Sequence, residues 1–270
     1  MTEKDRGARR GSDQVQCFSC YGARIEVSSP DAFIVDALPA LVPPHAQMTA
    51  LENTDVQVRV RSHDGDAWQI MTSISDVPVR ATTARIFHEL QSSLHDAVAQ
   101  YARGYLFVHA GVVAVDGKAI VAPGKTMTGK TTLVRALIDL GAHYVSDEFA
   151  VLSQDGLVHP YPKPLSMRDE HGVANLVKPE QVGAKLQVDP VPVGLVARTS
   201  YEEGSVWQPT PMGAAETLLA LLANTVAVRT VPALTMQVLG VVSENCTGLG
   251  GTRGEAEACA NALIEQLSQA

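Results

Sequence analysis

The sequence predicts an α/β fold with a P-loop core, preceded by a smaller N-terminal α+β region. Three observations lead to this prediction: a glycine-rich motif between an apolar strand and a helix, a β-hairpin directly before that motif, and alternating strands with one amphipathic helix near the N-terminus. We expect a disordered tail over 1–16, the N-terminal region over 17–102 and the P-loop domain over 103–270.

The strongest motif is a complete P-loop pattern. Residues 124–131 read GKTMTGKT, the apolar run 119–122 before them fits a buried strand, and 128–140 has helical spacing. In that setting backbone N–H groups at the start of the helix bind phosphates, a lysine reaches the β- and γ-phosphates, and a threonine hydroxyl holds Mg²⁺. The expected cofactors are therefore ATP and Mg²⁺. The predicted nucleotide-binding residues are Gly124, Lys125, Thr126, Met127, Thr128, Gly129, Lys130, Thr131 and Thr132.

A hairpin precedes the loop. The Asp-Gly pair at 116–117 joins two apolar runs, 108–115 and 118–122, and this pattern predicts a two-residue type I′ turn. Counting outward from the turn places His109 opposite Gly124. The imidazole would then contact the γ-phosphate or hold the loop, unless it is an ordinary histidine at a strand end; the spacing leaves both readings open.

Two adjacent acids follow the next predicted strand. The helix is expected to end at Gly141, and the strand 143–146 leads directly into Asp147 and Glu148. If this strand runs parallel to 119–122, both acids lie at the sheet edge that carries the P-loop. One carboxylate can then hold Mg²⁺ while the other accepts a proton from an attacking hydroxyl. An acidic turn without function is the alternative.

The P-loop domain resembles a known kinase superfamily. His109, the P-loop, SDEFAVL at 146–152 and HPYPKPLSMR at 159–168 together resemble the HPr serine kinase/phosphorylase superfamily, specifically its short HPr-kinase-related members. That superfamily shares its core with the ATP-dependent phosphoenolpyruvate carboxykinases. The resemblance implies that Asp147 is the general base, that Lys130 binds the γ-phosphate, that Thr131 is a metal ligand and that His109 is the active-site histidine.

The chain departs from the family pattern at three places, of which the replacement of the usual loop serine by Thr126 is a mild one. Met127 stands where the loop usually has glycine, and Ser166-Met-Arg168 stands where HPr kinases carry a glutamate-arginine-glycine signature. HPr itself is therefore not the expected acceptor. Between the acids and Arg168, three prolines stiffen the segment 160–164, which can present Lys163 and Arg168 to an anionic substrate or can simply cross between strands.

These features predict an ATP-dependent kinase that transfers the γ-phosphate to a hydroxyl group. Asp147 would take the proton, while Lys130 and Mg²⁺ held by Thr131 and Glu148 would neutralise the developing charge. The short HPr-kinase-related proteins include kinases of lasso-type precursor peptides, so the resemblance implies a peptide serine as acceptor. A small-molecule hydroxyl is the first alternative. A nucleotide-binding regulatory protein without transfer is the second.

Composition limits the partners and the location. The net charge is −8 and the pI is about 5.5, and aromatic residues make up only 5% of the chain, which disfavours nucleic acid as a partner. We find neither a signal peptide nor an apolar stretch long enough to span a membrane, so we expect a cytoplasmic protein that does not bind membranes. The composition is compatible with a homo-oligomer.

The N-terminal region is less informative. Residues 18–27, 55–60 and 68–74 are predicted strands, and 83–102 is predicted as a helix with one core-facing stripe. The prolines at 39, 43 and 44 are expected to break the span between the strands.

Two further features lie outside the kinase motifs. Cys17 and Cys20 have the C-x-x-C spacing of a redox pair or half a zinc site, but no completing ligands follow, so we expect reduced cysteines. Arg253, in Gly-Thr-Arg-Gly, could contact phosphate or adenine; we expect it on the surface.

Overall fold

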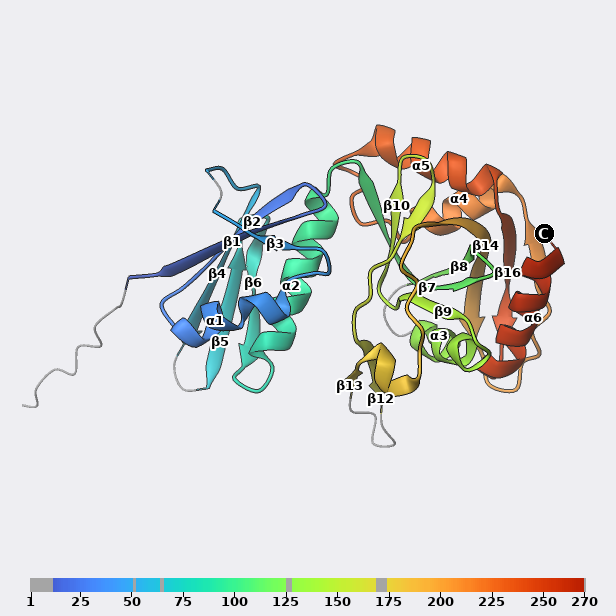
Figure 1. Cartoon of the computed structure of the whole chain (residues 1–270), viewed down its shortest axis with the longest axis horizontal. Helices are drawn as coiled ribbons and strands as arrows, with labels where there is room; N and C mark the ends of the chain where they lie inside the picture. Colours follow the sequence, from blue (N-terminus) through green and yellow to red (C-terminus); the bar gives the residue numbers. More distant parts are fainter. Residues whose placement is uncertain (1–11, 51, 64–65, 125–127, 169–173, 270) are drawn as a thin grey trace, which may run out of the picture. The chain divides into compact units, whose positions relative to one another are not determined.

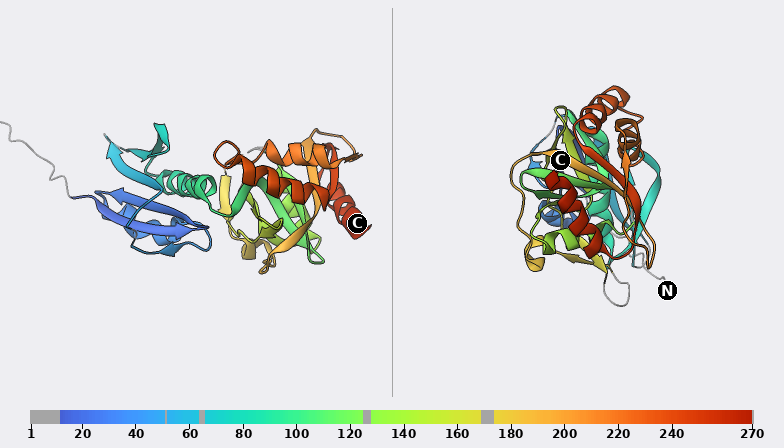
Figure 2. Two further views of the ribbon diagram at one scale, coloured as in Figure 1. Left: turned by 90° about the horizontal axis from the view of Figure 1, so that it is seen from above. Right: turned by 90° about the vertical axis from the view of Figure 1, so that its right-hand side faces the viewer.

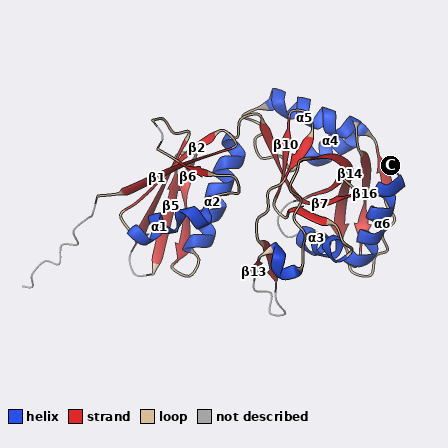
Figure 3. Ribbon diagram, in the orientation of Figure 1, coloured by secondary structure: helices blue, strands red, loops and turns tan. Residues whose placement is uncertain are grey.

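The structure, a computed structural model, describes residues 12–50, 52–63, 66–124, 128–168 and 174–269. The chain divides into two compact units, Met1–Ala102 and Arg103–Ala270. Each unit contains both helices and strands, as the colouring in Figure 3 shows, so the structure is a mixed α/β one. The two units are described separately below.

The first unit is a six-stranded sheet with two helices. Its elements are β1 (Gln14–Cys20), β2 (Ala23–Ser29), α1 (Ala32–Leu41), β3 (Gln47–Met48), β4 (Val56–His63), β5 (Ala67–Thr72), β6 (Ser75–Thr82) and α2 (Ile86–Tyr101). The strand order is β3-β1-β2-β4-β5-β6, with β2 and β4 parallel and the other neighbours antiparallel. Both helices contact β2 and each other (Figure 1).

Sequence patterns in this unit predicted the long helix and misjudged the first strands. The stripe from Ile86 to Val98 in α2 is buried as expected. The run 18–27, however, is two strands joined by a turn at Tyr21-Gly22, where both residues have positive φ. The first of these strands begins at Gln14, inside the stretch expected as tail.

The helix α1 was missed because it contains a proline. Pro39 lies within α1, where it lacks the N–H of a normal helical residue. Ile34, Val35 and Leu38 of this helix are buried, and tertiary packing of such a face contributes most of the stability of a short helix. Packing therefore outweighs the missing hydrogen bond. Of the three prolines that were expected to break this span, those at 43 and 44 lie beyond the end of the helix.

The second unit carries the P-loop motif. Its elements are β7 (Tyr105–Val115), β8 (Lys118–Pro123), α3 (Lys130–Asp139), β9 (His143–Ser146), β10 (Phe149–Ser153), β11 (Leu157–His159), β12 (Leu165–Arg168), β13 (Ala174–Val177), the 3₁₀ turn η1 (Pro179–Val182), β14 (Val191–Tyr201), β15 (Thr210–Met212), α4 (Ala214–Leu222), α5 (Pro232–Glu244), β16 (Thr247–Arg253) and α6 (Ala256–Gln269). The helix α5 was not anticipated from the sequence.

The predicted hairpin forms with the predicted register. Asp116 and Gly117 both have positive φ, as a type I′ turn requires, and Val115 pairs with Lys118. At the far end of the hairpin the amide of Gly124 donates to the carbonyl of His109, with an N···O distance of 3.0 Å. The hairpin therefore fixes where the P-loop leaves the sheet.

The strands of the second unit form one eight-stranded sheet and a separate hairpin. The main order is β11-β10-β7-β8-β14-β16-β15, with β9 paired to β7 and β11 also paired to β14; β12 pairs only with β13. Strands β8, β14 and β16 are mutually parallel. Strand β9 is antiparallel to β7, as β8 is, so β9 and β8 run in the same direction. Their C-terminal ends therefore share an edge, as the sequence predicted.

Helices cover both faces of this sheet. Figures 1 and 2 show α3 and α6 on one face and α4 and α5 on the other. The side chains of β7 alternate between two hydrophobic clusters: Val112 lies in the cluster with α4 and α5, and Val113 lies in the cluster with α3 and α6. This packing holds the N-terminal end of α3 at the sheet edge. Among the described residues, no helix is both long enough and apolar enough to cross a membrane.

Candidate active site

The N-terminal end of α3 is the framework of the site. Gly129 directly precedes the helix with φ of 80°, a left-handed conformation that glycine adopts without a Cβ penalty. The helix then begins with Lys130 and Thr131, so its first unpaired N–H groups lie beside both side chains. Thr128, Gly129 and Thr132 frame this turn as expected, while Lys125, Thr126 and Met127 lie outside the described residues.

Close packing fixes α3 against β7. Gly111 in β7 faces the helix, and a Cβ built on it would lie 2.6 Å from Cγ2 of Val134 and 3.5 Å from Cβ of Lys130. Contacts this short leave no room for a side chain. The glycine therefore allows the first turn of α3 to lie directly on the strand that carries His109.

Thr131 is in contact with Asp147, and not with Glu148, the acid that the sequence had placed beside it at the metal. The hydroxyl of Thr131 donates to Oδ2 of Asp147 at 2.8 Å, and this bond links the first turn of α3 to the residue after β9. The second oxygen of Asp147, Oδ1, is buried without a hydrogen bond of normal geometry, although the backbone N–H of Ser166 lies close enough to favour the charged carboxylate. Burial raises the pKa of Asp147 to about 6, although the Thr131 hydroxyl and Lys130 both favour its charged form.

The second acid has a different partner. Oε2 of Glu148 forms an ion pair with Nζ of Lys163, and the two side chains are 25% and 13% exposed. The carbonyl of Lys163 accepts a 2.6 Å hydrogen bond from the hydroxyl of Tyr144, which anchors the proline-rich segment beside β9. Lys163, predicted to face a substrate anion, therefore lies on Glu148 in this structure.

His109 lies at the end of β7 within the same group of charges. Its ring packs against Phe149 with centroids 4.7 Å apart, and Phe149 in turn contacts Phe107 and Tyr161, all three fully buried. Burial lowers the pKa of His109, with Glu148 opposing the shift and Lys130 adding to it. The ring is therefore neutral at pH 7, with one nitrogen able to donate and the other able to accept a hydrogen bond.

The electrostatics of Lys130 couple it to both acids. Burial lowers the pKa of Lys130, while Asp147 and Glu148 raise it. The half-buried ammonium group of Lys130 is stabilised only while negative charge remains close to it, and the two carboxylates supply that charge. The structure thus brings together His109, Lys130, Asp147 and Glu148, which the sequence had placed at one sheet edge.

The remaining predicted substrate residue is only partly described. Arg168 ends β12, but its side chain is not among those described. The aromatic cluster behind His109 was not foreseen, because no sequence pattern links Phe107, Phe149 and Tyr161.

Arg253 was expected on the surface, and this is wrong. Its side chain is 2% exposed and donates to the carbonyl of Gly129 at 2.9 Å. The signal for this contact was its place at the C-terminal end of a strand parallel to β8, on the same sheet edge as the P-loop.

The donor atoms suit a magnesium ion better than a transition metal. No group of three or more His, Cys, Asp or Glu side chains that could hold a metal occurs in the described part of the chain. Mg²⁺ needs fewer protein ligands, because it keeps several waters and shares one or two carboxylates with substrate phosphates. The Thr131 hydroxyl and Oδ1 of Asp147 fit that requirement.

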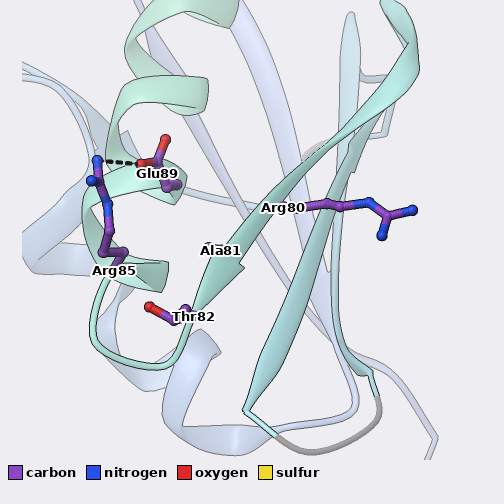
Figure 4. A pocket seen from close by; sticks show the side chains of 5 residues that line it. All are labelled: Arg80, Ala81, Thr82, Arg85 and Glu89. Carbon is purple, nitrogen blue, oxygen red and sulfur yellow. Dashed lines mark hydrogen bonds and ion pairs between the residues drawn. The ribbon is translucent and has the colours of Figure 1, made fainter.

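Two other features lie in the first unit. Cys17 and Cys20 pair with Glu26 and Ala23 across the β1–β2 ladder, so their side chains point to opposite faces of the strand. Burial raises the pKa of Cys20 to about 12, which keeps the thiol protonated. A shallow hollow in the first unit, shown in Figure 4, is lined by Arg80, Ala81, Thr82, Arg85 and Glu89 and contains none of the predicted site residues.

Comparison with known proteins shows a structural likeness to a kinase/phosphatase. No protein-family model matches the chain, and no curated protein matches it. Among solved structures, the Hpr(Ser) kinase/phosphatase from Coxiella burnetii is similar at 17% sequence identity, over 60% of this chain and 93% of that chain, with a TM-score of 0.34. At that TM-score the function has to be argued from the site.

Proposed function

We propose that this chain is an ATP-dependent kinase that transfers the γ-phosphoryl group to a hydroxyl, most specifically a serine hydroxyl of a ribosomal precursor peptide of the lasso type. The observation that carries the kinase proposal is the contact between Thr131 and Asp147, with Lys130 beside it. A P-loop threonine and a carboxylate at the end of a neighbouring strand together hold the metal of a nucleotide phosphate in P-loop enzymes. The peptide acceptor rests on the sequence resemblance of residues 105–170 alone.

The contacts favour an exchange of roles between the two acids. A general base has to reach the proton that it removes, at about 2.6–3.2 Å between heavy atoms. In Asp147, Oδ2 is bonded to Thr131 and Oδ1 has no exposure, so this carboxylate suits the metal. Glu148 is 25% exposed and becomes available to an acceptor hydroxyl when Lys163 moves away. We therefore assign Asp147 to Mg²⁺ and Glu148 to the acceptor proton, the reverse of the roles that the sequence suggested.

The other site residues have supporting roles. Lys130 and the first N–H groups of α3 lie where they can bind the transferred phosphoryl group and neutralise its charge. His109, neutral at pH 7, can donate a hydrogen bond to a phosphate oxygen without adding charge. When bound, Mg²⁺ would supply further charge neutralisation between the phosphates.

A direct transfer assay tests the function. The full chain is incubated with γ-labelled ATP and Mg²⁺, together with serine-containing precursor peptides and, separately, a panel of hydroxyl metabolites. Label on a peptide serine is the expected result. If label appears only on a metabolite, the kinase proposal stands and the proposed acceptor is wrong. ATP binding without any transfer would overturn the kinase proposal.

One observation favours a second candidate function, a nucleotide-binding regulatory protein. Glu148 forms an ion pair with Lys163, so one of the two acids has a partner from the protein itself. A protein that only senses nucleotide needs the phosphate-binding turn and no accessible base. Transfer activity that is lost in Glu148→Gln would exclude this candidate.

A further inference from the structure

Arg253 is the most deeply buried charged side chain near the site. It is the last residue of β16 and is 2% exposed, although arginine is almost never fully buried unless it is paired. Within the described residues, no carboxylate lies within ion-pair distance of its guanidinium. Within the described part of the chain, this charge is therefore buried without a carboxylate partner, which is costly.

The guanidinium is held by neutral groups. Nη2 donates to the carbonyl of Gly129 at 2.9 Å, Nη1 donates to the carbonyl of Gly254 at 3.0 Å, and Nε has no hydrogen-bond partner. The ring of Tyr201 lies 5.5 Å from the guanidinium carbon, measured to the ring centroid. Carbonyls and an aromatic ring orient a cation, but none of them cancels its charge.

The contact with Gly129 acts on the phosphate-binding end of α3. The carbonyl of Gly129 and the N–H of Lys130 belong to one peptide group, and this N–H is the first of α3. The same carbonyl also accepts the Leu133 amide at 3.1 Å, so Arg253 adds to the first helical bond and does not replace it. Hydrogen bonds in a chain polarise one another, so a cation at the oxygen makes the N–H a stronger donor.

We propose that Arg253 is a positioning residue for the phosphate end of the nucleotide: it fixes and polarises the Gly129–Lys130 peptide, and its unbalanced charge is compensated by the bound phosphates. This inference rests on the proposed function, because it requires that the N-terminus of α3 binds a nucleotide. The fork of the guanidinium reaches Gly129 and Gly254 together, which a lysine ammonium cannot reproduce with the same geometry.

The test compares nucleotides that differ in phosphate number. Binding of Mg·ATP and of AMP, which lacks the β- and γ-phosphates, is measured by calorimetry for the full chain and for Arg253→Gln, Arg253→Lys and Arg135→Gln. Arg135 is a matched control, because it lies on α3 and pairs with Asp139 on the solvent side. We expect Arg253→Gln to weaken ATP binding by at least about tenfold and AMP binding little, with Arg253→Lys between it and the wild type and Arg135→Gln unchanged.

The outcomes separate this inference from the proposed function. If ATP and AMP weaken by the same factor, or if neither weakens, Arg253 is a structural residue only and the inference fails while the kinase proposal stands. If Arg253→Gln does not fold, the ATP-to-AMP affinity ratio of Arg253→Lys decides in the same way. If the wild type binds no ATP, both proposals fail. If it binds ATP and shows the expected ratios but transfers nothing, only the kinase proposal fails.

Discussion

The hydroxyl of Thr131 is hydrogen-bonded to Oδ2 of Asp147 at 2.8 Å, and this bond joins the helix after the P-loop to the strand that ends at the acids. The strands that precede the two residues along the chain, β8 and β9, run in the same direction and are separated in the sheet by β7. The contact between the two residues shows that the crossover through α3 brings both strand ends to one edge.

Replacing Lys130 by alanine should abolish transfer without unfolding the protein. The side chain is half-buried beside Asp147 and Glu148 and is not part of a hydrophobic cluster, so its loss removes a charge for the phosphates and little packing. A charge-assisted contact to the transition state is worth ~3–4 kcal/mol, or about 10²–10³ in rate. Initial rates with γ-labelled ATP and a thermal melt check this. Lys185→Ala, on an exposed position, is the control, and normal turnover in folded Lys130→Ala would contradict the kinase proposal.

The two acids should respond differently to amide substitution. Because Asp147 is assigned as a ligand of Mg²⁺, Asp147→Asn should raise the Mg²⁺ concentration needed for half-maximal activity. Glu148→Gln should lower kcat by about 10²–10⁴ and leave the Mg²⁺ dependence unchanged, because it removes only the proton acceptor. Thr131→Val should resemble Asp147→Asn, since the two side chains share a bond. Steady-state rates across a Mg²⁺ series distinguish these effects, and the opposite pattern would restore the roles suggested by the sequence.

The buried carboxyl of Asp147 should make stability depend on pH. Its folded pKa of about 6 lies above the value of about 3.9 for an unfolded aspartate, so the folded state holds the proton more tightly. The stability contributed by that proton is complete below about pH 4 and is lost as pH rises through about 6. Asp147→Asn removes this loss. The melting temperature of the variant minus that of the wild type should therefore grow between pH 4 and 6 and stay constant above. A difference that does not change with pH would show that the folded pKa is not raised. These melting temperatures are measured without added Mg²⁺ or nucleotide.

The sequence predicted those parts of the site that are determined by residues close together in the chain. A type I′ turn fixes the hairpin register by counting, so the position of His109 opposite Gly124 followed from Asp116-Gly117. The P-loop helix and the strand leading to Asp147 likewise followed from spacing along the chain.

The features of the site that the sequence did not predict are tertiary. The Glu148–Lys163 pair, the aromatic packing of His109 and the burial of Arg253 each join segments far apart in the chain, and no local period reports them. The same holds for α1, where burial of Ile34 and Leu38 overrides a proline. Local propensity is a weak guide wherever packing decides the outcome.

Loss of Lys163 should expose the charge that it balances. In Lys163→Met, Glu148 keeps its negative charge close to Asp147 without its partner, and breaking one side of a partly buried pair costs about 1–3 kcal/mol. We expect a lower melting temperature than the wild type, and we expect Mg²⁺ to raise it more in the variant because the cation replaces the lost charge. The double variant Lys163→Met with Glu148→Gln should recover most of the stability. If the double variant is no more stable than Lys163→Met, the ion pair is not what stabilises this segment.

Gly111 and Val134 should behave as a complementary pair that sets the position of α3. A Cβ on Gly111 would lie 2.6 Å from Cγ2 of Val134, and valine is stiff at χ1, so Gly111→Ala has to push the helix away from β7. Overpacking of this kind costs about 1–3 kcal/mol. The shift should also weaken ATP binding, because Lys130 and Thr131 move with the first turn.

Val134→Ala alone leaves a small cavity, but in combination with Gly111→Ala it removes the clashing methyl groups. The double variant should therefore be more stable than the sum of the single effects predicts and should bind ATP more tightly than Gly111→Ala. Chemical denaturation and calorimetry measure both quantities, and strictly additive effects would show that the two residues do not determine the position of the helix.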